Sequence, residues 1–282
     1  MSETAVASAP ATSGNLGPGF DCLGLAIGIR CTVRARIADE WSVEYIGENR
    51  PAKGGGGSVL SAARFAVGDR PLAMGVHNEI PFGKGLGSSA AAFVAGAAAA
   101  LRAVGEDASP DRVYRIAEEL EGHPDQVAAA VYGGLTLIPA EGLPIRLPIH
   151  PSIRPVLAVP GTRLPTMEAR AVLEDRLPRD VVVRSLSRVI ALTAGLITAD
   201  PGLLAGAHGD EIHEAPRAKL SPEVTELVEI AKNAGALHAA RSGAGPSVLA
   251  LVTSESADRV MGAFKEHGVA VLTPHVEPTG LV

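Results

Sequence analysis

Cysteine and aromatic residues are scarce in this chain. Its 282 residues include two cysteines, Cys22 and Cys31, and aromatic residues make up 3% of the composition. Two cysteines are too few for a disulfide framework, and their spacing matches no zinc signature. With so few aromatic rings, a surface on which nucleic-acid bases stack is not expected. A chain of this length buries enough surface to fold without disulfides or a structural metal.

An excess of positive charge is also missing. The chain has 25 lysines and arginines against 31 aspartates and glutamates, which gives a formal net charge of −6. A general nucleic-acid binder usually has a basic balance, so this class of protein is excluded. Apolar residues make up 46% and charged residues 20%, which is typical of a globular protein and not of a disordered one.

Long apolar runs are absent as well. The segment Met1 to Pro10 has neither a basic start nor a long apolar stretch, so no signal peptide is expected. The run nearest to a membrane span, residues 90–101, is alanine-rich and shorter than the roughly 18 residues required. We therefore expect a cytoplasmic protein that has no membrane partner and no nucleic-acid partner.

Segments typical of strands and of helices occur in both halves of the chain, which predicts an α+β or α/β fold. Strands are expected at residues 5–9, 26–37, 42–46, 72–80, 156–159, 247–252 and 269–272. Helices are expected at residues 59–67, 90–104, 111–120, 166–173, 181–197, 222–234 and 256–267. In the fifth of these helices, Leu186, Ile190, Thr193 and Ile197 recur at helical spacing. Segment 42–46 is expected to pair with segment 26–37, and residues 50–57 read as a flexible loop.

A proline-rich stretch divides the chain into two expected domains. Residues 139–155 contain five prolines and little periodicity. A chain of this length accommodates one large or two medium domains. We therefore predict an N-terminal domain of residues 1–150 and a C-terminal domain of residues 151–282.

The most informative motif is the glycine-rich string from Pro81 to Ala91, followed by an alanine-rich helix. Glycines let backbone N–H groups approach a ligand, and the helix adds its unpaired N–H groups and positive end. Together they form a cradle for phosphate. The string is neither a Walker A loop nor a Rossmann fingerprint, because Gly87 precedes Ser88 and the third glycine is missing. A shorter string of this kind is also typical of a structural turn with an N-cap.

Three further motifs combine glycine turns with polar side chains. Residues 10–21 hold Asn15 and Asp21, which suit a polar substrate or their own turns. Residues 118–126 hold four carboxylates and His123, which suit Mg²⁺ and a substrate or a solvated helix end. Residues 241–247 form a glycine turn between a helix and a strand. The spacing from His208 to His213 does not match a zinc protease site.

Taken in chain order, these motifs resemble those of the homoserine kinase family within the GHMP small-molecule kinases. The matching segments are residues 10–25, 81–91, 121–125, 132–134, 166–173, 213–217 and 242–248. The resemblance implies a two-domain α+β GHMP kinase fold, with an S5-domain-2-like N-terminal half that binds ATP and a ferredoxin-like C-terminal half. It also implies Mg²⁺-dependent transfer of the ATP γ-phosphoryl group to the side-chain hydroxyl of L-homoserine, a step of threonine biosynthesis, and it suggests a homodimer.

The resemblance also implies roles for individual residues. The ATP-binding positions are Pro81, Gly83, Lys84, Gly85, Leu86, Gly87, Ser88, Ser89, Ala90 and Ala91. The substrate positions are Asn15, Asp21, His123, Arg170 and Arg217, and the two arginines match positions that hold the substrate carboxylate. Ser242, Gly243 and Gly245 form a substrate or phosphate loop. Ser88 and Glu119 match the Mg²⁺ ligands, with Glu118 or Glu121 as alternatives to Glu119.

Two positions depart from the family pattern. Gln126 stands where these kinases have asparagine or an aspartate base, and a neutral amide cannot act as a general base. We therefore expect catalysis by alignment, Mg²⁺ and backbone donors, with Gln126 at most orienting the hydroxyl. Ser58 stands in an expected asparagine segment, which leaves the adenine contacts open. Two other functions are considered: a GHMP kinase for an isoprenoid precursor or sugar, and a non-catalytic nucleotide-binding protein of this fold.

Overall fold

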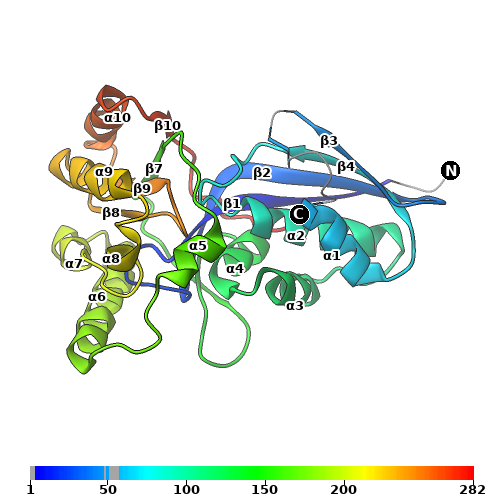
Figure 1. Cartoon of the computed structure of the whole chain (residues 1–282), viewed down its shortest axis with the longest axis horizontal. Helices are drawn as coiled ribbons and strands as arrows, with labels where there is room; N and C mark the ends of the chain where they lie inside the picture. Colours follow the sequence, from blue (N-terminus) through cyan, green and yellow to red (C-terminus); the bar gives the residue numbers. More distant parts are fainter. Residues whose placement is uncertain (1–3, 48, 51–56) are drawn as a thin grey trace.

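Two β-sheets, one in each half of the chain, organise the molecule (Figure 1). The computed structural model describes residues 4–47, 49–50 and 57–282. The first sheet holds β1 (Ala5–Gly14), β2 (Leu23–Ile37), β3 (Ser42–Ile46), β4 (Leu72–Asn78), β5 (Leu135–Leu137) and β6 (Ile145–Leu147). The second sheet has the order β10 (Ala270–Leu272), β7 (Arg154–Val159), β9 (Val248–Val252), β8 (His238–Arg241). The combination of helices and sheets confirms the predicted α+β class.

The long strand β2 is the centre of the first sheet. It pairs antiparallel with β1 along nearly its whole length, with β4 through residues 31–37, and with β5 through residues 23–25. The prediction that segment 42–46 pairs with β2 was wrong, because β4 occupies that edge of β2. Segment 42–46 is β3 and pairs parallel with β4, to which it is connected through a helical crossover.

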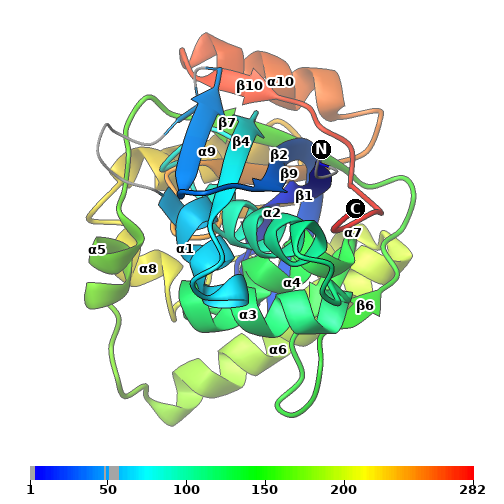
Figure 2. The same ribbon diagram turned by 90° about the vertical axis from the view of Figure 1, so that its right-hand side faces the viewer.

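Among the described residues of the first half, helices α1 to α4 pack beside this sheet (Figures 1 and 2). They are α1 (Gly57–Val67), α2 (Ser88–Ala103), α3 (Pro110–Glu121) and α4 (Pro124–Tyr132). Most of α2 is buried, and its alanines let it lie close to β1, β2 and α1. At Gly96 a side chain would collide with the backbone of Val59, so the close packing depends on small residues.

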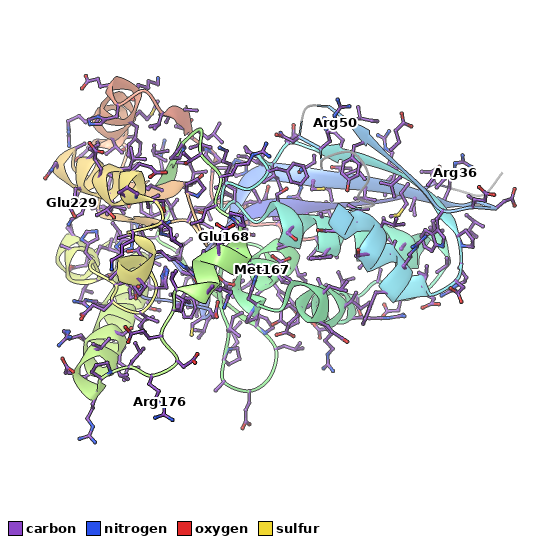
Figure 3. The ribbon with its side chains drawn as sticks, in the orientation of Figure 1. Arg36, Arg50, Met167, Glu168, Arg176 and Glu229 are labelled. Carbon is purple, nitrogen blue, oxygen red and sulfur yellow. The ribbon has the colours of Figure 1, made fainter. Side chains whose placement is uncertain are left out.

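The second half contains six helices among the described residues. They are α5 (Thr166–Ala171), α6 (Arg179–Thr198), α7 (Pro201–Gly206), α8 (Glu214–Arg217), α9 (Pro222–Asn233) and α10 (Ala257–Glu266). Helices α9 and α10 pack on the second sheet, with Phe264 and Leu227 in their shared core. Helix α5 lies between the two halves, where Figure 3 labels Met167 and Glu168.

The sequence pattern missed several short elements. The unpredicted ones are α4, α7, α8, β5, β6 and β8. These are short, and β6 lies inside the proline-rich stretch where no structure was expected. Most of the loop predicted at residues 50–57 falls outside the described residues.

The two sheets part between the end of β6 and the start of β7. The last residues of the chain return to the first sheet, where Ser8 and Val282 exchange two backbone hydrogen bonds and Val276 bridges Ile27. The division into residues 1–150 and 151–282 stays a prediction. In either case the C-terminal tail packs on the N-terminal half.

Helix α6 differs from the other described helices in its surroundings. By length and composition alone, it is the one helix in the described part of the chain that could cross a membrane, with a mean hydropathy of 1.6. Only 22% of the most apolar 18-residue stretch of α6 is buried. Its buried side packs on α7, and Gly195 allows the close approach of Leu204.

Candidate active site

The glycine-rich loop lines a cavity of about 290 Å³ at the N-terminal end of α2. Gly85 and Gly87 have positive φ angles of 73° and 66°, a backbone region that favours glycine. No side chain caps the N-terminus of this 16-residue helix in the structure. Its first N–H groups and the positive end of its dipole are therefore available to an anion such as phosphate.

The Lys84 side chain, predicted to bind ATP, is directed elsewhere. Its ammonium donates hydrogen bonds to the carbonyl oxygens of Pro160, Gly161 and Thr162, at 2.6, 2.8 and 2.5 Å. Burial, followed by the nearby Arg163 cation, lowers the pKa of Lys84. The side chain thus links the loop to the second half of the protein, and the backbone of the loop is what faces the cavity.

Of the three carboxylates expected as metal ligands, Glu119 first and Glu118 or Glu121 as alternatives, Glu121 is the one that lines this cavity. Glu121 lines the cavity together with Ser88 and Ser89, whereas Glu119 is exposed. Glu118 is also turned away, since it accepts a hydrogen bond from the Tyr114 hydroxyl. Residues 119 and 121 are about 200° apart around a helix, so only one of them can face the loop.

The surroundings of Glu121 disfavour its charged form. Burial raises the pKa of this carboxyl to about 7, and a hydrogen bond from the Ser89 hydroxyl acts in the opposite direction. The Ser88 hydroxyl lies at the same helix end, within 3.2 Å of the Asn78 amide. Oxygen donors of these two types are the ligands that Mg²⁺ prefers.

The C-terminal glycine turn closes the other side of the loop. The Ser242 hydroxyl is 2.7 Å from the carbonyl oxygen of Gly85 and 2.9 Å from the Ser13 hydroxyl. The Gly243 N–H donates to the carbonyl oxygen of Gly14. Three motifs that are far apart in the sequence, residues 10–21, 81–91 and 241–247, therefore meet at one place.

Asn15 holds this meeting point together. Its side-chain amide donates to the carbonyl oxygen of Gly243 at 3.1 Å, and its side-chain oxygen accepts from the Asp21 N–H at 3.0 Å. Asn15, Leu16 and Asp21 all have positive φ angles, which is uncommon for residues other than glycine. Such strain is often found at functional sites. The geometry of Asn15 is therefore compatible both with a role in stabilising its own turn and with a role in binding a substrate.

Asp21 and Arg170 form a bidentate ion pair across the two halves. The guanidinium donates two hydrogen bonds, of 2.6 and 3.1 Å, to the two carboxylate oxygens. Both side chains keep about a third of their surface exposed, at 34% for Arg170 and 30% for Asp21. The Arg170 guanidinium also lies 5.4 Å from the centre of the Phe20 ring. The pair thus presents one anion and one cation side by side.

Arg217 also lies over the Phe20 ring, 5.7 Å from its centre, and is fully buried. Its Nε donates to the carbonyl oxygen of Ala169, and its Nη1 is 2.9 Å from Nδ1 of His213. The His213 ring stacks on Phe20 and bonds through Nε2 to the carbonyl oxygen of Gly17. Burial lowers the pKa of His213 to about 4, so the ring is neutral and accepts from Arg217 at neutral pH.

His123 and Gln126 lie on the N-terminal side of the same region. Both line the cavity of the glycine loop. Gln126 accepts a hydrogen bond of 3.4 Å from the Thr12 hydroxyl. His123 lies 3.8 Å from Glu121, and burial together with Arg170 lowers its pKa. Ser58, the departure at the adenine segment, also lines this cavity and contacts Ser89 at 3.1 Å.

Sequence reasoning missed three residues that support this site. Asp125 is buried, accepts a hydrogen bond from the Asn15 N–H, and has a pKa raised to about 7 by burial. Phe20 and His213 stack on each other, and both guanidiniums lie near the Phe20 ring. All three lie inside motifs that the sequence analysis identified. Nothing in the sequence marks them out from their neighbours in those motifs, and only their contacts in the structure show that they support the site.

Behind this cluster, Glu214 is a carboxyl whose ionisation opposes folding. Burial raises its pKa from 4.5 to about 7. Because the unfolded chain releases this proton at lower pH, the folded state loses stability as pH rises from about 4.5 to 7.

Glu214→Gln removes the titration of this carboxyl. The melting temperature of the variant relative to that of the wild type is therefore expected to rise between about pH 4.5 and 7 and to level off above this range. Thermal unfolding at several pH values measures the difference. An exposed control, Glu266→Gln, is expected to show no such trend, and a flat difference for Glu214→Gln would contradict the assignment.

Family models match both halves of the chain. The model of the GHMP kinase N-terminal domain matches residues 54–134, and the model of the GHMP kinase C-terminal domain matches residues 197–270. Together with the two-sheet fold and the glycine loop at the start of α2, these matches define the chain as a GHMP kinase. A mevalonate kinase from Methanococcus jannaschii, with a TM-score of 0.68 at 15% identity, shares the fold.

Within this class, the chain belongs to the homoserine kinase family. It is 39% identical over 266 residues to a homoserine kinase from Thermus thermophilus, covering 92% of this chain and 90% of the relative. It is 41% identical over 265 residues to a homoserine kinase from Streptomyces coelicolor, covering 89% and 85%. The crystal structure of homoserine kinase from Cytophaga hutchinsonii superposes with a TM-score of 0.87 at 28% identity, covering 100% and 98%.

Proposed function

We propose that this protein transfers the γ-phosphoryl group of ATP to the side-chain hydroxyl of L-homoserine, giving O-phospho-L-homoserine. The observation that carries the proposal is the half-buried pair of Asp21 and Arg170, whose guanidinium lies near Glu121 of the phosphate-cradle cavity. An α-amino acid has one ammonium and one carboxylate, and this pair offers a partner for each. When the substrate binds, its ammonium replaces Arg170 beside Asp21, and its carboxylate takes the guanidinium fork.

Arg217 extends this recognition from the buried side. Its described hydrogen bonds use Nε and Nη1, which hold the guanidinium in one orientation above Phe20. The remaining nitrogen, Nη2, would donate to the substrate carboxylate. Because His213 is neutral and accepts from Nη1, Arg217 keeps its full positive charge for the substrate.

The oxygen donors at the end of α2 fit a Mg²⁺ ion. Ser88 and Glu121 are the residues that would hold it, which replaces Glu119 as the acidic ligand. When bound, the ion neutralises charge on the β- and γ-phosphates of ATP. The chain itself contributes the backbone N–H groups of the loop and of the first turn of α2, which hold the phosphates in line with the substrate hydroxyl.

Neither Gln126 nor Asp125 is expected to act as a general base. Gln126 is a neutral amide, and the buried Asp125 is directed toward the Asn15 backbone. We therefore expect Gln126→Ala to lower kcat less than Ser88→Ala does, because Gln126 at most orients the hydroxyl. Steady-state kinetics of the two variants measures this order. An equal or larger loss for Gln126→Ala would contradict catalysis by alignment.

Arg170→Lys is expected to raise the KM for homoserine about 10-fold, with little change in kcat. Lysine keeps the charge but loses the fork that gives two parallel hydrogen bonds to a carboxylate. A hydrogen bond to a charged group contributes about 1.5–3 kcal/mol, and the lower end of this range corresponds to a factor of about 10. Initial-rate measurements over a range of homoserine concentrations provide the test. Arg112→Lys, at the end of helix α3 that is opposite Glu121, serves as the control, and an unchanged KM for Arg170→Lys would remove Arg170 from the carboxylate site.

An ADP-release assay with homoserine, mevalonate and galactose tests the function as a whole. Turnover with homoserine alone is the expected result. Turnover with mevalonate or galactose would instead support another GHMP kinase activity. ATP binding without turnover of any of the three would support a non-catalytic nucleotide-binding protein.

We also propose a cytoplasmic location, in keeping with the step of threonine biosynthesis that this reaction serves.

A further inference from the structure

Three backbone carbonyl oxygens converge on the Lys84 ammonium from one short segment of the other half. They belong to the successive residues Pro160, Gly161 and Thr162, and they lie 2.6, 2.8 and 2.5 Å from Nζ. A lysine ammonium has three hydrogen-bond donors and no acceptor, so all of its donors are used here. We call these three oxygens the 160–162 carbonyl cluster.

The carbonyl cluster needs a cation to keep this geometry. Each carbonyl oxygen carries partial negative charge, and three that point to one place repel one another unless a positive charge lies between them. In potassium channels, rings of such oxygens replace the hydration shell of the ion. The Lys84 side chain supplies similar chemistry, because its ammonium is a compact point charge. The shape of segment 160–163 therefore depends on Lys84.

The glycine loop, by contrast, does not depend on the Lys84 side chain for its place. The Lys84 carbonyl oxygen accepts a hydrogen bond of 3.2 Å from the Ser247 N–H. The Gly85 carbonyl oxygen accepts one of 2.7 Å from the Ser242 hydroxyl. Neither contact involves the ammonium, so both remain when it is removed. The ammonium is therefore expected to act mainly on the segment that it binds.

The segment that Lys84 binds leads directly into the helix that carries Arg170. After this segment the chain buries Leu164 against Ala169 and Ala244, and then forms α5. Helix α5 itself has little packing to hold it, because Ala169 is its one buried residue and Met167 is 85% exposed (Figure 3). Arg170 stands in the last turn of this helix. Its position therefore depends on how the segment before α5 is anchored.

We propose that Lys84 positions Arg170 for homoserine binding, and that its ammonium does so as a tethered monovalent cation in the 160–162 carbonyl cluster. This role rests on the proposed function, in which Arg170 binds the substrate carboxylate. The cluster also has a ligand class. When the lysine side chain is removed, a free monovalent cation of similar size, such as potassium or ammonium, occupies the same oxygens. Lys84 thus serves homoserine binding, although it stands in the loop that holds ATP.

Lys84→Met, assayed in tetramethylammonium chloride, is expected to raise the KM for homoserine about 10-fold, the effect of losing one hydrogen bond to a charged group. Methionine has a similar length but no charge, and tetramethylammonium is too large for the cluster. The KM for ATP is expected to change much less. Potassium chloride or ammonium chloride at the same ionic strength is expected to return the KM for homoserine to within about 2-fold of wild type.

Lys265→Met, an exposed change on α10, is the control for this experiment. Neither this variant nor the wild type is expected to respond to potassium. A wild-type KM for homoserine in Lys84→Met would overturn the proposal. A rise in the KM for ATP alone would show that Lys84 binds phosphate during the reaction, and would overturn it as well. A raised KM for homoserine that potassium leaves unchanged would overturn the tethered-cation role.

The double variant Lys84→Met/Arg170→Lys tests whether Lys84 acts through Arg170. If it does, the two effects on the KM for homoserine overlap, and the double variant is expected to resemble Arg170→Lys alone. Effects that multiply would show that Lys84 acts independently of Arg170, and would overturn the positioning role.

Thermal unfolding without substrates separates this proposal from the proposed function. Replacing tetramethylammonium by potassium is expected to raise the melting temperature of Lys84→Met, but not that of the wild type or of Lys265→Met. A wild-type protein that does not phosphorylate homoserine would contradict the proposed function, and the melting temperatures would still decide whether the cluster binds a cation. Wild-type turnover, together with a Lys84→Met protein that potassium neither stabilises nor restores, would overturn this proposal alone.

Discussion

Glu121→Gln is expected to lower kcat at least about 100-fold, which corresponds to about 2.7 kcal/mol of transition-state stabilisation. Glutamine has the same shape as glutamate, so the helix end and the cavity keep their form. The variant loses the negative charge that Mg²⁺ requires from its protein ligand. The proposed step needs that charge to hold the metal beside the phosphates. Rate measurements over a range of Mg²⁺ concentrations should show a raised Mg²⁺ requirement together with the lower kcat.

Glu119→Gln is the matched control for this experiment. Glu119 lies two residues away on the same helix, but its side chain is exposed and outside the cavity. It is expected to keep wild-type kcat and Mg²⁺ dependence. The assignment of the metal site would be reversed if Glu119→Gln lost the activity and Glu121→Gln retained it.

Gly85→Ala is expected to lower kcat/KM for ATP at least about 100-fold. A methyl group at this position would collide with the carbonyl oxygen of Ser242 and approach the backbone of Gly245. The positive φ of 73° is also strained for alanine. The loop must therefore move away from the C-terminal turn, which misplaces the N–H groups that hold the phosphates. A misplacement of about 1 Å in the groups that position a substrate can reduce the rate about 100-fold.

Gly83→Ala separates this collision from the backbone strain. Gly83 belongs to the same loop and has a similar φ of 66°, but a methyl group there would meet only the Arg163 side chain, at 3.5 Å. Its loss of kcat/KM is expected to be much smaller. Circular dichroism and thermal unfolding of both variants check that each is folded. Equal losses in the two variants would indicate that loop strain, and not contact with Ser242, determines ATP binding.

Much of the candidate site could be predicted from the sequence because its parts are local strings. The glycines before Ser88 and the turn around Asn15 need particular backbone angles, and those requirements leave a pattern in neighbouring residues. The likeness to homoserine kinases depended on the same strings. Strand β2 was predictable from its period-two alternation, and helix α2 from its run of strong helix formers.

The choice between Glu119 and Glu121 could not be made from the sequence. Both stand in the last turn of α3, and spacing alone left them as alternatives. Helix α3 ends after Glu121, and Gly122 turns the chain with a φ of 78°. This end point, and the rotation of α3 against α2, place Glu121 at the cavity. Such a rotation depends on packing between elements distant in sequence.

The sequence by itself determined that a chain with a net charge of −6 holds its phosphate ligand in a glycine-rich cradle at residues 81–91. It also determined the helical spacing of the apolar residues in segment 181–197. Only the tertiary structure decided that Asp21 and Arg170 form a pair, because 149 residues separate them in the chain. Only the tertiary structure decided, too, that the apolar residues of α6 face outward. Spacing along a helix fixes which side chains share a face. The elements that pack around the helix decide whether that face is buried, and the side of α6 that holds Leu186 and Ile190 is exposed.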